Sequence, residues 1–514
     1  MSVRFHRLVQ DGLLASAETV PTKPAVVAED RSATFAKLLI DAHTLAAWLQ
    51  DQGLERGDRV AVFMENSLAC VTTFLGVWLA GGVVVTVNAQ TKADRLTFIL
   101  DDSGAKFLIS EGPISAIAAE AREEAAITPR LVRARAPEGV APAAVDFELI
   151  VGEARVPHPS PAIPSDLAAL LYTSGTTGSP KGVMLTHQGL VFVTESIAEY
   201  LRLGCHDRIL NVLPLSFGYG LSQVLLATRL GATLLLERSF AYPAKTLQRI
   251  EAEQATVVPA IPTILATLAS MFADKGRTYE SVTRITNAAA GLPPALHVPI
   301  RKLFPNSLLF RMYGQTECIR VCYLEPELVD QKPTSVGKAI PGTEAFLLDD
   351  EGLSVQPGEV GTLYVRGPHV MPGYWNAPGL TAEMIKEGRY EGDSLLCTHD
   401  LFTADEDGDL YFVSRSDEII KTRGEKVSPV HVENVLFAIE GVKEAAVAGV
   451  PDDLLGEAIT AYVVADEGAT LEPTEILRVC REGLEAFAVP HEIRFVDDLP
   501  KTPSGKVRRK SLVP

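Results

Sequence analysis

The sequence predicts an α/β protein with a large N-terminal domain of layered α/β subdomains and a small, mobile α+β C-terminal domain. Three observations lead to this prediction. Short β-branched runs alternate with helix-length segments, the chain has 514 residues, and dense charge interrupts the pattern near Arg415. Alternating strands and helices are typical of mainly parallel sheets covered by helices. A single core seldom grows beyond about 250–300 residues, so more than one structural unit is expected.

The alternation is clearest in the first hundred residues. Strands are predicted at 59–63 and 83–87, where β-branched residues cluster, and a helix is predicted at 34–51. The stretch 70–87 is apolar enough to raise the question of a membrane span, but Gly81 and Gly82 divide it into a helix-like half and a β-branched half. We therefore expect a buried helix-to-strand junction and no membrane span.

The charged segment SRSDEIIKTRGEKVSP, which begins at Ser414, marks the predicted domain boundary. We place the N-terminal domain at 1–414 and the C-terminal domain at 415–514. In the C-terminal hundred residues, helix and strand patterns again alternate, which predicts a small α+β unit. Its expected helices and strands are helix 429–439, strand 445–450, strand 458–464 and helix 473–483.

Composition and charge exclude several classes of partner. The net charge of −18 opposes attraction to nucleic acid and to anionic membranes. The six cysteines form no CxxC pair, and the first residues lack the apolar core of a signal peptide, so we expect a protein of the reducing cytoplasm. Cys318 and Cys322 have the spacing that places two thiols on one helix face, yet ordinary packing is more common than a metal site.

A loop rich in Gly, Ser and Thr follows a predicted strand at 167–171. It reads YTSGTTGSPKG from Tyr172 to Gly182. Glycine lets backbone N–H groups approach an anion, hydroxyl groups donate further hydrogen bonds, and lysine supplies a positive charge. The loop is no P-loop, because Gly182 stands where that motif needs Ser or Thr. We predict that it binds a triphosphate through Thr173, Ser174, Gly175, Thr176, Thr177, Gly178 and Lys181.

In this loop and in further segments that follow in the same order, the chain resembles the superfamily of acyl-CoA synthetases, peptide-synthetase adenylation domains and firefly luciferase. The resemblance extends over essentially the whole chain. It implies an AMP-forming acid–thiol ligase that activates a carboxylic acid as acyl-AMP, releases pyrophosphate and passes the acyl group to a thiol. The implied cofactors are ATP, Mg²⁺ and coenzyme A.

The resemblance assigns nucleotide and metal roles to the segment YGQTE. It implies that Tyr313 stacks on adenine, that Thr316 contacts the α-phosphate, and that Glu317 holds magnesium. A carboxylate is a hard oxygen ligand of the kind that Mg²⁺ prefers. Seen alone, this segment would be read as an ordinary turn.

Two other segments are implied to contact the nucleotide. Ala289 and Ala290, in the segment NAAAG, correspond to small residues along adenine, and Ala288 corresponds to the wall of the acyl pocket. Asp400 matches the aspartate that accepts hydrogen bonds from the ribose hydroxyl groups. His399 departs from the family, which usually has glycine at this position.

The C-terminal residues are implied to act through domain motion. Arg415 matches an arginine that contacts ribose, and Asp417 matches the hinge about which the small domain rotates. Lys421 and Gly424 belong to the loop that enters the site for thiol transfer. Lys506 matches the lysine that reaches into the site during adenylation, where its ammonium stabilises developing negative charge.

The resemblance also implies that the acyl pocket lies around Phe217, Gly218 and Tyr219. Amino-acid-activating relatives place an aspartate where Gly218 stands, so no side chain compensates a buried ammonium group here. We therefore favour an aryl or apolar aliphatic acid. Arg320 admits two interpretations: a guanidinium that faces the pocket and binds a second polar group of the substrate, or a surface salt bridge, which is the more common case.

Two alternatives compete with an acid–CoA ligase. In the first, the acyl group goes to the phosphopantetheine of an acyl or peptidyl carrier protein, with an amino acid as a further substrate option. In the second, the chain is a non-catalytic nucleotide sensor built on the same fold. The sensor is disfavoured by five charged residues that suit catalysis: Lys181, Glu317, Asp400, Lys421 and Lys506.

Overall fold

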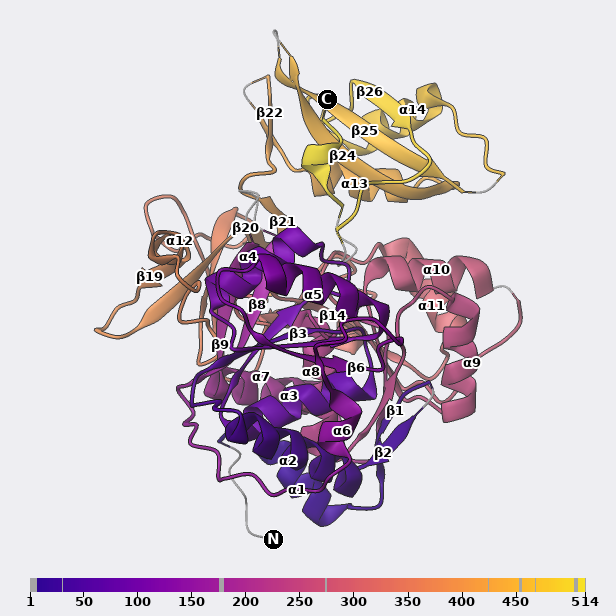
Figure 1. The fold of residues 1–514 in the computed structure, drawn as a ribbon. Helices are drawn as coiled ribbons and strands as arrows, with labels where there is room; N and C mark the ends of the chain where they lie inside the picture. The colour runs from indigo at the N-terminus through magenta and orange to yellow at the C-terminus, as the bar shows by residue number, and fades with distance from the viewer. Residues whose placement is uncertain are drawn as a thin grey trace.

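Four β-sheets organise the part of the chain that the structure describes (Figure 1). This computed structural model describes residues 7–29, 31–174, 180–272, 275–423, 425–452, 455–466, 468–502 and 507–513. Two large, mainly parallel sheets with helices and a third, antiparallel sheet make up the N-terminal part. The fourth sheet forms a smaller unit, drawn in yellow at the top of Figure 1. The predicted α/β fold class with a large N-terminal and a small C-terminal domain is confirmed.

The first sheet has the strand order β7-β6-β5-β3-β4-β8-β9 and is parallel except for the β8–β9 hairpin. Its strands are β3 (Arg59–Phe63), β4 (Val83–Val87), β5 (Phe107–Glu111), β6 (Arg130–Ala134), β7 (Val145–Asp146), β8 (Leu167–Ser174) and β9 (Pro180–Thr186). The helices of this region are α1 (Asp11–Thr19), α2 (Phe35–Asp51), α3 (Leu68–Ala80), α4 (Ala93–Ser103), α5 (Ser115–Glu124), α6 (Phe147–Val151) and α7 (His187–Tyr200).

Successive residues of β3 are buried in two different cores. Val60 and Val62 pack with α2 and α3 on one face, whereas Ala61 and Phe63 pack with α4 and α5 on the other. Burial on both faces explains why this strand is apolar throughout. The predicted strands at 59–63 and 83–87 are confirmed.

The buried helix-to-strand junction at Gly81 is also confirmed. Ser67 caps the start of α3 by accepting a hydrogen bond from the Cys70 backbone N–H, and Gly81 ends α3 in the left-handed conformation with φ 88°. Glycine adopts that conformation without steric cost. Within the described ranges, no helix combines the length and apolar character that a membrane crossing requires.

The second sheet has the order β16-β15-β14-β13-β12-β10-β11-β1-β2. The strands from β10 to β14 pair in parallel, and the two ends of the sheet are antiparallel. Its strands are β1 (Pro24–Val27), β2 (Ser32–Thr34), β10 (Arg208–Asn211), β11 (Thr233–Leu236), β12 (Val257–Ala260), β13 (Arg284–Asn287), β14 (Leu308–Tyr313), β15 (Cys322–Leu324) and β16 (Lys338–Ala339). The accompanying helices are α8 (Gly218–Leu230), α9 (Pro243–Glu253), α10 (Pro262–Phe272) and α11 (His297–Leu303).

The third sheet is antiparallel and leads the chain towards the C-terminal unit. It consists of β17 (Glu344–Leu348), β18 (Gly361–Arg366), β19 (Ile385–Glu387), β20 (Ser394–Ala404) and β21 (Leu410–Arg415), with α12 (Pro378–Met384) before β19. Strands β20 and β21 pair so that Asp400 lies opposite Arg415. This register brings together two residues that the sequence assigned to ribose binding.

The fourth sheet begins just after the predicted hinge residue Asp417. It consists of β22 (Ile420–Thr422), β23 (Glu425–Val427), β24 (Val442–Asp452), β25 (Gly456–Ala465) and β26 (Glu492–Phe495), with α13 (Pro429–Phe437) and α14 (Pro473–Gly483). The predicted helix 473–483 matches α14, and the other three predicted elements of this unit are present with slightly different ends. Long β24–β25 pairing extends both strands beyond the apolar runs that predicted them.

Candidate active site

The segments NAAAG and YGQTE are brought together by parallel strands. NAAAG begins at the end of β13, YGQTE begins at the end of β14, and these strands are neighbours, with Asn287 opposite Arg311. The carboxyl ends of neighbouring parallel strands lie at one edge of a sheet, which is where α/β proteins place their ligands. Thr316 and Glu317 lie in the turn after β14. Sequence motifs that are about 25 residues apart therefore share one edge of the sheet.

The predicted phosphate loop joins β8 to β9. Thr173 pairs with Lys181 across the hairpin, so the lysine is held beside the strand that enters the loop. Gly175, Thr176, Thr177 and Gly178 lie outside the described residues, as does the side chain of Ser174. The structure thus positions the two ends of the predicted phosphate loop.

Tyr374, which the sequence did not reveal, connects the phosphate loop with the predicted magnesium ligand. Its hydroxyl group donates a hydrogen bond to Glu317 Oε1 at 2.7 Å, and Lys181 Nζ lies 5.5 Å from the centre of its ring. Burial, together with the nearby Glu317 carboxylate, raises the pKa of Tyr374 above its usual range, so the hydroxyl remains a proton donor. Lys181 and Glu317 therefore approach the same aromatic side chain from different sheets.

The position of Tyr374 is fixed by backbone pairing with β9. The Met184 N–H donates to the Gly373 carbonyl at 3.1 Å, and the Trp375 N–H donates to the Gly182 carbonyl at 2.8 Å. This contact joins segments about 190 residues apart in the sequence. No local periodicity or composition signals such a pairing, which is why sequence reasoning missed Tyr374.

A buried carboxylate, Asp400, forms the centre of the predicted ribose site. Its Oδ2 accepts hydrogen bonds from the Tyr313 hydroxyl at 2.6 Å and from Gln315 Nε2 at 2.8 Å. Arg415 Nε lies 3.3 Å from Oδ1, but Oδ1 has no hydrogen-bond partner among the described residues. A buried acceptor without a donor is uncommon in native structures. A ribose hydroxyl group would supply the missing donor.

Tyr313 is held by aromatic contacts as well as by its hydrogen bond. Its ring meets Phe402 edge-on with ring centres 4.9 Å apart, and Phe412 lies 6.5 Å away. Burial is the main cause that raises the pKa of Tyr313, and Asp400 adds to it. The hydroxyl therefore stays protonated and donates to Asp400.

His399, which stands where the resemblance implies glycine, has an unusual backbone conformation. Its φ of 56° lies in the left-handed region, which glycine adopts freely and other residues adopt at a cost. His399 Nδ1 lies 4.0 Å from Cys397 Sγ, and Nε2 lies 3.3 Å from the Glu383 carbonyl oxygen. His399 thus holds a conformation that suits glycine and places an imidazole side chain next to Asp400 in the sequence.

The residues predicted for the acyl pocket gather at the start of α8. Phe217 precedes the helix, and Gly218 and Tyr219 lie in its first turn. A Cβ atom added at Gly218 would lie 2.6 Å from Ile319 Cδ1, so Ile319 packs directly against this turn. Ala288, the first residue after β13, is buried. Sequence reasoning missed Ile319, because its contact with Gly218 comes from the fold and not from a motif.

Arg320 does not form a surface salt bridge, so the interpretation that we considered more common is wrong. Only 2% of the residue is exposed, and its guanidinium lies 5.3 Å from the centre of the Tyr219 ring. The turn after YGQTE reverses the chain and directs this side chain inward. A Cβ atom at Gly314 would lie 2.4 Å from the Ile319 carbonyl oxygen, which shows how tightly the turn closes.

The residues implied to act from the C-terminal domain are partly described. Asp417 Oδ2 lies 3.2 Å from Lys510 Nζ, and Asp417 Oδ1 lies 4.0 Å from Arg415 Nε. Lys421 is exposed on β22, in the sheet that Figure 1 shows above the other three. Gly424 and Lys506 lie outside the described residues. The structure therefore does not place Lys421 with the residues around Asp400.

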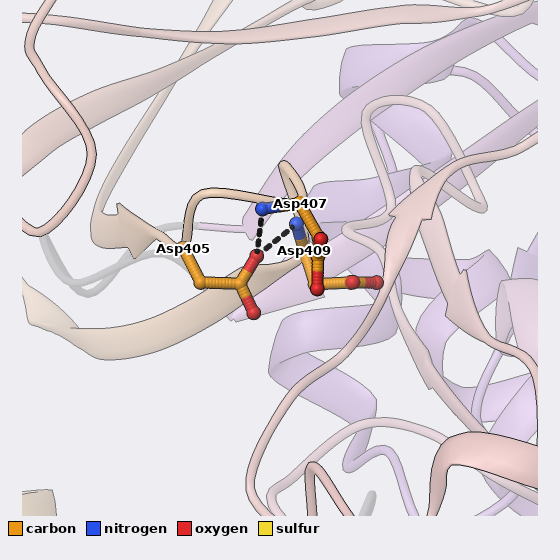
Figure 2. Close-up of side chains that lie close together, drawn as sticks. All are labelled: Asp405, Asp407 and Asp409. Atoms are coloured by element: carbon orange, nitrogen blue, oxygen red, sulfur yellow. Dashed lines mark hydrogen bonds between the residues drawn. The ribbon is translucent and has the colours of Figure 1, made fainter.

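A cluster of acidic side chains elsewhere has the spacing of metal ligands. Asp405, Asp407 and Asp409 have carboxylate oxygens within 4.8 Å of one another (Figure 2). Lys332 Nζ contacts all three, at 2.8, 2.7 and 2.5 Å. Asp405 Oδ1 also accepts the backbone N–H groups of Asp407 and Asp409. The lysine ammonium provides the positive charge that these carboxylates need, so they form a structural turn.

The two cysteines four residues apart do not share a helix. Cys318 lies in the turn after β14, Cys322 begins β15, and both are buried. Burial raises the pKa of Cys318 to about 12, so its thiol stays protonated. The expectation of ordinary packing fits both residues, whereas the helical arrangement considered for them is wrong.

Comparison with known protein families supports a nucleotide site. A family model described as AMP-binding enzyme matches residues 13–375, and one described as AMP-binding enzyme C-terminal domain matches residues 431–506. The chain is 31% identical to a long-chain-fatty-acid–CoA ligase of Bacillus subtilis, over 99% of this chain and 94% of the relative. It is 28% identical to a 3-hydroxybenzoate–CoA ligase of Aromatoleum sp., over 96% of this chain and 93% of the relative.

Solved structures show the same fold over nearly the whole chain. An o-succinylbenzoate CoA synthetase from Bacillus subtilis, in complex with its acyl-adenylate intermediate, aligns with a TM-score of 0.84 and 29% identity, covering 98% of this chain and 97% of that one. A benzoate CoA ligase from Burkholderia xenovorans aligns with a TM-score of 0.88 and 26% identity, covering 98% and 99%.

Proposed function

The chain belongs to the family of AMP-binding enzymes and is an AMP-forming acid–CoA ligase, and we propose that its acid is aryl or apolar aliphatic. The observation that carries the catalytic assignment is the approach of Lys181 and Glu317 to Tyr374. A cation that suits phosphates and a carboxylate that suits magnesium lie around one side chain, beside the buried Asp400 site.

The first half-reaction forms acyl-AMP. A carboxylate oxygen of the acid attacks the α-phosphorus of ATP, and the bond to pyrophosphate breaks. The residues of this chain bind and orient the reactants: Asp400 and Arg415 at the ribose, Ala289 and Ala290 along the adenine, Thr316 at the α-phosphate, and Lys181 with the loop 173–178 at the β- and γ-phosphates. Magnesium held by Glu317 would offset the negative charge of the phosphates.

The second half-reaction forms the thioester. The sulfur of coenzyme A attacks the acyl carbonyl carbon, and AMP leaves. We propose that the C-terminal domain rotates at Asp417 between the two steps, so that Lys506 serves adenylation and the loop with Lys421 and Gly424 serves transfer. The short connection between β21 and β22 supports this proposal, because few residues separate the third sheet from the fourth.

The proposed hinge predicts unequal effects on the two half-reactions. Asp417→Pro fixes φ at this position, so one domain orientation should be favoured and one half-reaction should fall about tenfold more than the other. ATP–pyrophosphate exchange measures adenylation, and the reaction of supplied acyl-AMP with coenzyme A measures transfer. Asp417→Ala, which removes the contact with Lys510 but keeps the backbone free, is the control. Equal losses in both assays with a lowered melting temperature would argue against a hinge.

The acid assignment depends on the first turn of α8. At Gly218 no side chain is present to pair with an ammonium group, so an α-amino acid is disfavoured. The apolar Ile319 packs against the same glycine, which fits an apolar acid.

Substitution of Gly218 tests this pocket. Gly218→Ala must displace Ile319, because the added Cβ lies 2.6 Å from Ile319 Cδ1. We expect kcat/KM for aryl and apolar aliphatic acids to fall about tenfold, with the KM for ATP unchanged, since one methyl group in a tight pocket has effects of this size. Gly218→Asp should lower activity further but spare acids that carry an amine. Gly379→Ala, at a site with open space around it, is the matched control. If the wild type and the Gly218 variants rank a panel of acids in the same order by kcat/KM, Gly218 does not line the pocket.

The acyl acceptor is tested by direct competition. We propose coenzyme A and not a carrier protein, because the ligases to which the chain is similar are named for coenzyme A. The purified enzyme should form the thioester with free coenzyme A at least as fast as with a phosphopantetheinylated carrier protein at the same concentration. The six free cysteines and the use of ATP and coenzyme A fit the cytoplasm as its location.

A further inference from the structure

Arg320 is a buried cation that has no carboxylate partner among the residues that the structure describes. It is 2% exposed, and its Nε has no hydrogen-bond partner in the described part of the chain. Among the described residues it forms no ion pair. A buried charge is costly unless it is paired or fully hydrogen-bonded, so an arginine in this state is expected to have a partner that the protein alone does not provide.

Another buried arginine, Arg311, shows what a structural arginine looks like in the same region. Arg311 is 4% exposed, and its guanidinium donates to the carbonyl oxygens of Ser335 at 3.1 Å and Leu292 at 2.8 Å. Arg311 Nη1 also lies 3.1 Å from His297 Nε2. Arg311 is thus tied to the backbone on several sides. The Arg320 guanidinium lies over the Tyr219 ring and within hydrogen-bond reach of the Tyr200 hydroxyl group, whereas its Nε has no partner among the described residues.

Arg320 lies beside the proposed acyl pocket. Its guanidinium is over the ring of Tyr219, which belongs to the first turn of α8, and its neighbour Ile319 packs against Gly218. Burial raises the pKa of Tyr219 to about 12, and the positive charge of Arg320 opposes that rise, so the charge acts on this turn. The first turn of a helix also presents unpaired backbone N–H groups with partial positive charge. The charge of Arg320 and the N-terminus of α8 both favour an anion beside the first turn of α8.

We propose that the acid substrate carries a second carboxylate, distant from the reacting one, and that Arg320 binds it. The inference rests on the proposed function and narrows its substrate class to an acid with an apolar body between two carboxylates. A guanidinium can bind a carboxylate through two parallel N–H···O hydrogen bonds. The bound carboxylate would supply the missing counter-charge, and the apolar body would lie against Ile319 and Phe217.

Matched acids test this proposal. Adipate is compared with hexanoate, and terephthalate with 4-methylbenzoate, by measuring kcat/KM for acid-dependent AMP formation with coenzyme A. The wild type should prefer the diacid of each pair by about tenfold or more, because a charged hydrogen-bonded pair contributes at least this factor. Arg320→Met should lose the preference because the KM for the diacid rises, whereas Arg320→Lys should keep part of the preference. Arg202→Met, at an exposed arginine paired with Glu325, should behave as wild type.

A binding measurement separates this proposal from the proposed function. Non-hydrolysable acyl-sulfamate analogues of the four acyl-AMPs are titrated calorimetrically into wild type and Arg320→Met, so that no turnover is needed. Tighter binding of the carboxylate-bearing analogues to the wild type alone supports the proposal. Equal or weaker binding of the carboxylate-bearing analogues by the wild type, or an equal preference for them in Arg320→Met, overturns it. Loss of acid-dependent AMP formation with every acid would instead contradict the proposed function.

Discussion

Replacement of Lys506 by alanine is expected to lower acid-dependent ATP–pyrophosphate exchange by about 10²–10³-fold, the usual effect of removing a group that stabilises transition-state charge. We propose that the ammonium group acts while the carboxylate attacks the α-phosphate and negative charge grows there, and that it has no part in thiol transfer. The reaction of supplied acyl-AMP with coenzyme A should therefore remain within a few-fold of wild type.

A lysine in the same segment provides the control for Lys506. Lys501 pairs with Glu444 at 2.7 Å, so Lys501→Ala removes an equal charge from a structural contact. It should leave both half-reactions nearly unchanged. If Lys506→Ala exchanges pyrophosphate at the wild-type rate, Lys506 has no role in adenylation.

Replacement of Glu317 by glutamine should reduce adenylation roughly 100-fold or more, because it removes the charge that would hold magnesium against the phosphates. Glutamine keeps the Oε1 acceptor for the Tyr374 hydroxyl, so the local structure is retained. The variant should also require a higher magnesium concentration for half-maximal pyrophosphate exchange. An unchanged magnesium dependence would contradict the role given to Glu317.

Tyr374→Phe separates the metal role of Glu317 from its positioning. This variant removes the hydrogen bond of 2.7 Å to Glu317 but keeps the carboxylate and the ring beneath Lys181. We expect a loss of about 10-fold or less in pyrophosphate exchange, as for groups that orient a metal ligand. A loss as large as that of Glu317→Gln would show that Tyr374 itself acts in the reaction.

The sequence predicted those features that depend on local pattern. The strands at 59–63 and 83–87 follow from clusters of β-branched residues, and helix 473–483 follows from the alternation of helix and strand patterns, whereas the nucleotide residues stay predictions from ordered motifs. The resemblance implies that Asp400 and Arg415 contact one ligand, and the structure places them opposite each other on β20 and β21. Such motifs predict a site because they specify both the backbone turn and the side chains that the turn presents.

The sequence did not reveal features that depend on contacts between distant segments. Tyr374 reaches Glu317 because residues 373–375 pair with β9, and Ile319 meets Gly218 because the turn after β14 closes on α8. The same turn buries Arg320, which composition alone would place at the surface. Local spacing also suggested a helix for Cys318 and Cys322, where the chain instead turns and enters β15.

The most direct test of acyl adenylation followed by thioester formation is the product balance of a single reaction mixture. The purified enzyme is incubated with ATP, magnesium, coenzyme A and each acid of a panel that includes the aryl acids and diacids above, and AMP, pyrophosphate and acyl-CoA are quantified. We predict equal amounts of all three products with at least one acid, and none without acid. Formation of ADP and phosphate, or ATP turnover that does not require an acid, would contradict this function.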